Sequence, residues 1–215
     1  MRKLWTPEGC YPISAVGLDA DGVIRDTGYV AYITVCKIIE HFGGKAPPYA
    51  DFILKEFDHP TYCRRHGAHM DMDQFRKMYY EVHPPDLEGL PFSDVVGFCK
   101  SVALMGLDLF VVSSCREDWL LPWFERHSMG AHFAYIVPQA RPKDAHLVDV
   151  CRQLGVEPEV MMYVGDMGHD MHAATTAGAI PVGITRGHHE ENASLRSVGA
   201  KLVVQSLEHL SVLIS

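Results

Sequence analysis

The chain has 215 residues, of which 47% are hydrophobic, and its formal net charge at pH 7 is −8. This length and composition predict one globular domain, or one domain with a modest insertion, and they exclude a disordered chain. The acidic balance and the lack of any Lys- and Arg-rich run exclude a typical nucleic-acid-binding protein.

The sequence also gives no sign of a membrane or secreted protein. Its apolar runs are too short to span a bilayer, and the first residues lack the apolar segment of a signal peptide. The six cysteines are scattered and form no CxxC pair, which indicates reduced thiols. We therefore expect a cytoplasmic protein.

The first predicted element is a buried strand over 13–18, which ends at Asp19-Ala20-Asp21-Gly22. Residues 1–12 show no pattern that we can interpret. Carboxylates at the end of a strand lie where open α/β sheets bind their ligands. Asp19 is placed to act there as a nucleophile, and Asp21 as a general acid and base. The same residues also suit an ordinary Asp-Gly turn.

Residues 28–91 differ in character from the rest of the chain. They hold three helical patterns, at 30–42, 50–57 and 71–82, but no convincing strand, and prolines separate the helices. We expect a helical cap domain over 28–91, inserted into a core formed by 1–27 and 92–215. The cap is expected to cover the active edge of the sheet.

From residue 91 onward, helices and strands alternate. The predicted helices cover 93–105, 117–127, 144–154 and 170–177, and the predicted strands cover 107–112, 133–137, 160–164, 180–184 and 201–204. Short apolar strands that alternate with amphipathic helices predict an α/β fold with a Rossmann-like parallel sheet covered on both faces.

Polar residues follow two more of these strands. Ser113 and Ser114 come after 107–112, where a hydroxyl and a backbone N–H are able to bind phosphoryl oxygens. Asp166 and Asp170 come after 160–164 and suit a Mg²⁺ site, because this ion prefers a few carboxylates together with water. Ordinary turn chemistry at the serines and helix capping by Asp166 are the alternatives.

A nucleophilic carboxylate that faces a phosphate dianion needs a cation beside it, because the two anions otherwise repel. The segment Gln139-Ala140-Arg141-Pro142-Lys143-Asp144 offers two cations, Lys143 at the start of a helix and Arg141 before it.

The order Asp19-x-Asp21, Ser113, Lys143 and Asp166-x-x-x-Asp170 resembles the motifs of the haloacid dehalogenase superfamily, in particular its phosphoglycolate-phosphatase-like branch with a helical cap. The resemblance covers residues 13–210. It implies a Mg²⁺ cofactor and these roles: Asp19 as nucleophile and metal ligand, Asp21 as general acid and base with its carbonyl on the metal, Ser113 on the phosphoryl group, Lys143 as the neutralising cation, Asp166 on the metal and Asp170 in support.

One departure from that branch concerns the cation. Its members often carry Lys-Pro-x-Pro where this chain has Arg141-Pro142-Lys143-Asp144, so a gapless match puts Arg141 in the place of the lysine. Other branches carry the lysine two residues later, and we favour Lys143 because Arg does not replace Lys freely. Arg141 stays a candidate for substrate binding, together with Ser114 and with Arg25.

Asp21 selects the chemistry, because it supplies the acid that a phosphate ester needs for its leaving group. We expect a Mg²⁺-dependent phosphatase that acts on a small, phosphoglycolate-like metabolite through an aspartyl-phosphate. A mutase of the β-phosphoglucomutase type and a non-catalytic binding protein are the alternatives. No nucleic-acid or membrane partner is expected, and the oligomeric state is left open between monomer and homodimer.

Overall fold

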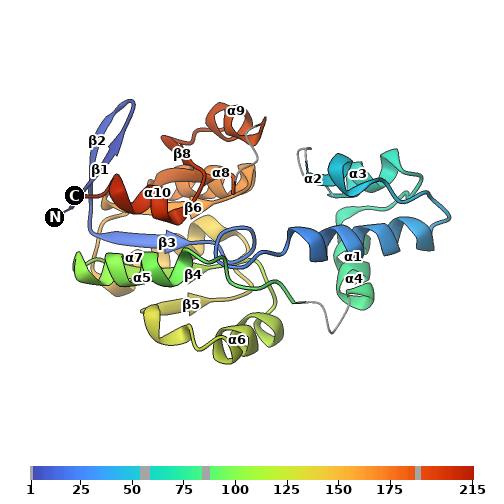
Figure 1. The fold of residues 1–215 in the computed structure, drawn as a ribbon, viewed down its shortest axis with the longest axis horizontal. Helices are drawn as coiled ribbons and strands as arrows, with labels where there is room; N and C mark the ends of the chain where they lie inside the picture. Colours follow the sequence, from blue (N-terminus) through green and yellow to red (C-terminus); the bar gives the residue numbers. More distant parts are fainter. Residues whose placement is uncertain (1, 54–58, 84–87, 187–189) are drawn as a thin grey trace. The chain divides into compact units, whose positions relative to one another are not determined.

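The computed structural model describes residues 2–53, 59–83, 88–186 and 190–215. The chain forms two compact units, one of residues 1–25 and 91–215 and the other of residues 26–90. The first contains a parallel sheet and is called the α/β unit here, whereas the second is called the helical unit (Figure 1). The helical unit interrupts the α/β unit after Arg25.

A six-stranded sheet with the order β5-β4-β3-β6-β7-β8 forms the centre of the α/β unit, and all neighbouring strands in it are parallel. Its strands are β3 (Ala15–Leu18), β4 (Asp108–Val112), β5 (Tyr135–Val137), β6 (Met161–Gly165), β7 (Ile180–Ile184) and β8 (Leu202–Val204). Every residue of β3, β6 and β7 is buried, as expected for strands covered on both faces. The predicted α/β class with a parallel sheet is confirmed.

Helices cover both faces of this sheet. They are α5 (Val95–Leu104), α6 (Glu117–Arg126), α7 (Lys143–Leu154), α8 (Gly168–Ala177), α9 (Glu190–Ser197) and α10 (Leu207–Val212), with short 3₁₀ turns η1 (Gly130–His132) and η2 (Pro158–Val160). Val16 and Leu18 of β3 pack in one core with α5, α6 and α10, whereas Ala15 packs in a second core with α7 and α8. This division follows from the alternation of side chains along a strand.

The helical unit contains α1 (Gly28–His41), α2 (Tyr49–Ile53), α3 (His59–Arg65) and α4 (Met72–Val82). The helix predicted at 50–57 corresponds to α2, and the end predicted for it lies outside the described residues. We did not predict α3, because Pro60 suggested a break, yet proline is tolerated in the first turn of a helix. No helix in the described part of the chain is long and apolar enough to cross a membrane.

An antiparallel hairpin of β1 (Arg2–Thr6) and β2 (Gly9–Ile13) precedes the sheet, in the segment to which we assigned no element. Leu4 also pairs with Ile214, so the hairpin is extended by the last residues of the chain. Within the hairpin only Leu4 and Ile13 are buried, and so the sequence carries no alternating apolar pattern that would reveal it.

Candidate active site

The polar residues predicted at strand ends come from three adjacent strands. Asp19 follows β3, Ser113 follows β4 and Asp166 follows β6, and β3 lies between the other two strands. Leu18 is in register with Val111 on one side and Val164 on the other. Because the strands are parallel, their carboxyl ends bring these residues to the same edge of the sheet.

Asp19 is fixed by backbone contacts on both of its sides. Its N–H donates to the carbonyl of Val164 at 2.9 Å, and its Oδ1 accepts from the N–H of Ala20 at 2.8 Å. The residue is only 6% exposed, and its Oδ2 lies 2.8 Å from Nζ of Lys143. Burial raises the pKa of Asp19, and Lys143 opposes that shift.

Lys143, the first residue of α7, is the cation that contacts Asp19. Its Nζ also lies 2.6 Å from Oδ1 of Asp170, which is fully buried. Burial by itself would lower the pKa of Lys143, but the two carboxylates outweigh burial and hold this pKa well above its ordinary value. Arg141, in contrast, is exposed and donates to the backbone carbonyl of Ser114 at 3.3 Å.

Three carboxylates gather at this point. Asp19, Asp166 and Asp170 each offer an oxygen, and these oxygens lie within 4.8 Å of one another. Burial, followed by the charges of Asp170 and Asp19, raises the pKa of Asp166 well above its ordinary value. Burial would also raise the pKa of Asp170, but Lys143, His169 and the N–H of Met167 together lower it. Three carboxylates against one ammonium leave excess negative charge on hard oxygen ligands, which suits Mg²⁺.

Asp21 lies outside this carboxylate cluster. Its Oδ1 accepts from Nε of Arg25 at 2.7 Å, and the Asp21 side chain is 41% exposed. Arg25 is buried and donates from Nη2 to Sγ of Cys115 at 3.0 Å, and its guanidinium carbon lies 5.6 Å from the ring centre of Trp123. Arg25, which we predicted to bind substrate, thus contacts Asp21 in this structure, and its role toward substrate stays a prediction.

The two serines are held by backbone groups. Ser113 is 1% exposed, and its Oγ accepts from the N–H of Cys115 at 3.2 Å. Ser114 is partly exposed and donates from Oγ to the carbonyl of Ala140 at 3.3 Å. The hydroxyl of Ser113 thus keeps its own proton available for an acceptor.

Gly22 permits the close packing of the turn after β3 against the end of β6. Its φ of 70° lies in the left-handed region, and a Cβ on this residue would collide with the carboxylate of Asp166. Only glycine fits both conditions without strain.

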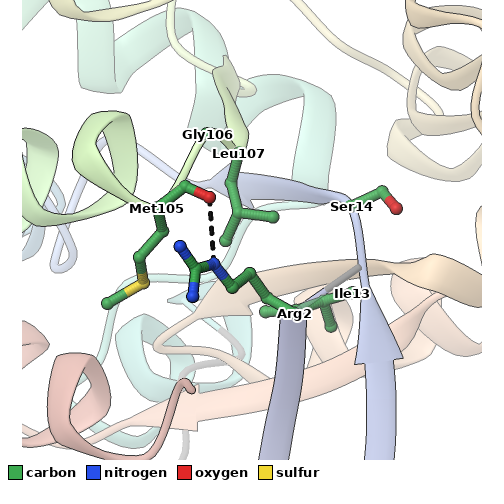
Figure 2. Close-up of a pocket in the computed structure, with 6 residues that line it drawn as sticks. All are labelled: Arg2, Ile13, Ser14, Met105, Gly106 and Leu107. Carbon is green, nitrogen blue, oxygen red and sulfur yellow. Dashed lines mark hydrogen bonds between the residues drawn. The ribbon is translucent and has the colours of Figure 1, made fainter.

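A small pocket lies away from this cluster (Figure 2). It is lined by Arg2, Ile13, Ser14, Met105, Gly106 and Leu107. Ile13-Ser14 and Gly106-Leu107 directly precede β3 and β4, so the pocket lies at the amino-terminal edge of the sheet. Nε of Arg2 donates to the carbonyl of Met105 at 3.0 Å across it. None of the predicted site residues lines this pocket.

Comparison with known proteins gives a family match. Residues 17–184 match the family model of haloacid dehalogenase-like hydrolases. Phosphoglycolate phosphatase 1 of Pseudomonas aeruginosa is 27% identical over 124 residues, which make up 55% of this chain and 45% of that protein. A phosphoglycolate phosphatase of Salmonella typhi is 32% identical over 102 residues, or 45% of this chain and 40% of that protein. The matches thus span less than half the length of these relatives.

Solved structures with the same fold cover nearly the whole chain. A predicted phosphatase from Clostridium acetobutylicum superposes with a TM-score of 0.78 at 16% identity, covering 94% of this chain and 97% of that one. A candidate beta-phosphoglucomutase from Thermotoga maritima gives a TM-score of 0.67 at 20% identity, covering 93% of this chain and 97% of that one. At these identities the comparison shows a shared fold alone.

Proposed function

Because the chain belongs to the haloacid dehalogenase-like hydrolase family, we propose that it is a Mg²⁺-dependent phosphatase acting on a small phosphorylated metabolite. The observation that carries this proposal is the buried contact of Lys143 with Asp19 and Asp170 at the edge of the sheet. A carboxylate held beside an ammonium and next to two more carboxylates suits attack on a phosphate group.

In the proposed reaction, a carboxylate oxygen of Asp19 attacks phosphorus and the bond to the ester oxygen breaks. Asp21 gives its proton to the departing alkoxide, so that an alcohol leaves. Asp21 then takes a proton from water, and the oxygen of that water attacks the phosphorus of the aspartyl-phosphate. Inorganic phosphate departs, and the carboxylate of Asp19 is restored.

The other site residues bind and neutralise charge. Lys143 offsets the charge of Asp19, and the hydroxyl of Ser113 donates to a phosphoryl oxygen, with Ser114 and Arg141 as further substrate contacts. Asp19 and Asp166, with the carbonyl of Asp21 and support from Asp170, would hold Mg²⁺. When bound, this ion neutralises charge on the phosphoryl group.

The substrate is proposed to be phosphoglycolate or a metabolite like it, because relatives named phosphoglycolate phosphatase match about half of the chain. We further propose that the helical unit, with predicted bounds 28–91, acts as a cap and selects the substrate. A cytoplasmic monomer or homodimer completes the proposal. All six cysteines lie in described residues, and no disulfide joins any two of them, which is consistent with a reducing compartment.

The test is phosphate release from phosphoglycolate, sugar phosphates and nucleoside monophosphates, with Mg²⁺ or with EDTA. We expect at least one substrate to be hydrolysed with Mg²⁺ only, and Asp19→Asn to abolish turnover. Asp108→Asn is the matched control, because Asp108 is exposed at the opposite end of β4. Conversion of β-glucose 1-phosphate to its 6-phosphate without phosphate release would favour a mutase. A folded protein that is inactive in every assay would favour a binding role.

A further inference from the structure

The turn that carries Asp19 and Asp21 is paired with the segment where the chain re-enters the α/β unit. The carbonyl of Ile24 accepts from the N–H of Phe92 at 3.0 Å, and Arg25 forms an antiparallel bridge with Pro91. The placement of the turn therefore depends on the placement of residues 91–94.

Arg186, which directly follows Thr185 after β7, contacts both of these segments. Its Nη1 lies 2.7 Å from Oδ2 of Asp94, and its Nη2 donates to the carbonyl of Val23. Its guanidinium carbon lies 3.9 Å from the centre of the Phe92 ring. The Arg186 side chain is 10% exposed and that of Asp94 is 12% exposed, so the pair is shielded from solvent.

Asp94 links these contacts to the rest of the α/β unit. Its Oδ2 also accepts from the N–H of Leu207 at 2.7 Å, in the first turn of α10. The Asp94 carboxylate is therefore anchored to a helix that packs in the core with α5. Arg186 contacts both this anchored carboxylate and the carbonyl of Val23, and so it ties the backbone of Val23 to α10. Val23 lies two residues after Asp21.

We propose that Arg186 is a positioning residue that fixes the turn 19–25 against the re-entry segment 91–94, and so holds Asp19 and Asp21 in place for the reaction. It acts on the turn through the backbone of Val23 and on the re-entry segment through Asp94 and the ring of Phe92. The catalytic part of this inference rests on the proposed function, whereas the contacts do not. Only a planar cation with a fork of donors makes all three contacts together.

The kinetic test compares Arg186→Met with Arg186→Lys. For Arg186→Met we expect kcat to fall roughly 10- to 100-fold, the scale of a small misplacement of reacting groups. KM should change by less than about threefold, because ground-state binding is retained. Arg186→Lys should recover part of kcat, since an ammonium is able to reach one of the two oxygens. Arg152→Met is the control, because Arg152 forms an exposed pair with Asp149.

Amide hydrogen exchange supplies a readout that does not depend on activity. In Arg186→Met we expect faster exchange at Ile24, Arg25 and Phe92, with unchanged protection in β3 and β6. If the wild type hydrolyses no substrate but this local exchange appears, the proposed function fails and the structural part of the inference stands. Unchanged exchange at these amides, or unchanged kcat in an active enzyme, overturns the inference.

Discussion

The α/β unit and the helical unit differ in what they bury. Among the described residues of the α/β unit, the buried charged ones are Asp19, Arg25, Lys143 and Asp170. Among the described residues of the helical unit, the one buried polar residue is Thr34, and the core consists of aliphatic and aromatic side chains such as Ile38, Phe52 and Phe75. Burial of charge is costly unless the charges compensate one another, so it marks where a protein performs chemistry.

This contrast supports the proposed division between a unit that performs the reaction and a unit that selects the substrate. The α/β unit fixes charged groups with short contacts, as expected of a reaction centre. The helical unit exposes aromatic rings close to the start of α1, with Tyr29 52% and Tyr49 38% exposed. Substitutions in the first unit are therefore expected to change the rate, and those on the surface of the second to change the choice of substrate.

The largest expected effect is that of Lys143→Met. It leaves Asp19 and Asp170 buried and facing one another without a cation, which costs about 3–5 kcal/mol of stability. It should also lower kcat on the order of 10³-fold, because the charge of the nucleophile is no longer offset. Arg141→Met is the matched control, since Arg141 is exposed, and we expect less than about 1 kcal/mol of destabilisation from it. The measurements are urea unfolding and steady-state kinetics. A greater loss of kcat in Arg141→Met would transfer the cationic role to Arg141.

Gly22→Ala should have the next largest effect. The φ of Gly22 is 70°, which costs an alanine about 1–2 kcal/mol, and the new Cβ would also displace the carboxylate of Asp166. Gly106→Ala separates the two causes, because Gly106 has the same φ of 70° but no described atom within 4 Å of the position that its Cβ would take. Gly106→Ala should lose only the stability that the φ costs, whereas Gly22→Ala should lose more and should also lose Mg²⁺ affinity, measured by calorimetry. Equal Mg²⁺ affinity in both variants would mean that Asp166 is not a ligand.

Asp166→Asn should stabilise the metal-free protein. The pKa of Asp166 is raised in the folded state, so its contribution to stability is present below its ordinary pKa of 3.8 and is lost as pH rises through the folded pKa. Above pH 3.8 the Asp166 carboxyl group therefore lowers the stability of the fold, and we expect Asn to raise Tm by roughly 2–4 °C without metal. Addition of Mg²⁺ should stabilise the wild type and not the variant. A lower Tm for the metal-free variant would contradict this account.

The parts of the site that were readable from the sequence lie directly after strands. Asp19 and Asp166 follow buried apolar runs, and parallel strands bring such positions to one edge whatever else the fold contains. The choice between Lys143 and Arg141 was harder, because both residues flank one helix start. In the structure Lys143 is buried and Arg141 is exposed. This difference depends on how α7 packs and not on local spacing in the sequence.

Other features depend on contacts between distant residues, which one sequence does not reveal. The hairpin is extended by a bridge between Leu4 and Ile214, which lie near opposite ends of the chain. The link from Arg186 to Asp94 joins residues 92 positions apart. The contacts of Arg25 with Cys115 and Trp123 likewise join residues 90 or more positions apart, so the sequence did not reveal them.

The smallest expected effect tests whether the helical unit selects the substrate. Tyr29 lies in the first turn of α1, and its ring centre is 5.5 Å from that of Tyr49 and 6.0 Å from that of Tyr32. Tyr29→Ala removes one exposed ring of this group, so we expect stability to change by less than about 1 kcal/mol. If the group contacts the substrate, the ratio of kcat/KM values between two substrates should shift about 3- to 10-fold.

Phe42→Ala is the matched control for this variant. Phe42 is 42% exposed and caps the other end of α1, so the two variants remove rings of similar exposure from one helix. Phosphoglycolate and a nucleoside monophosphate form a suitable pair of substrates, because they differ in whether the leaving group carries an aromatic ring. A shift in Tyr29→Ala alone would assign selection to the start of α1, where the chain has just left the turn with Asp19 and Asp21. If the ratio of kcat/KM values is the same in both variants and in the wild type, these tyrosines do not contribute to substrate choice. That result would contradict the proposal that this surface of the helical unit selects the substrate.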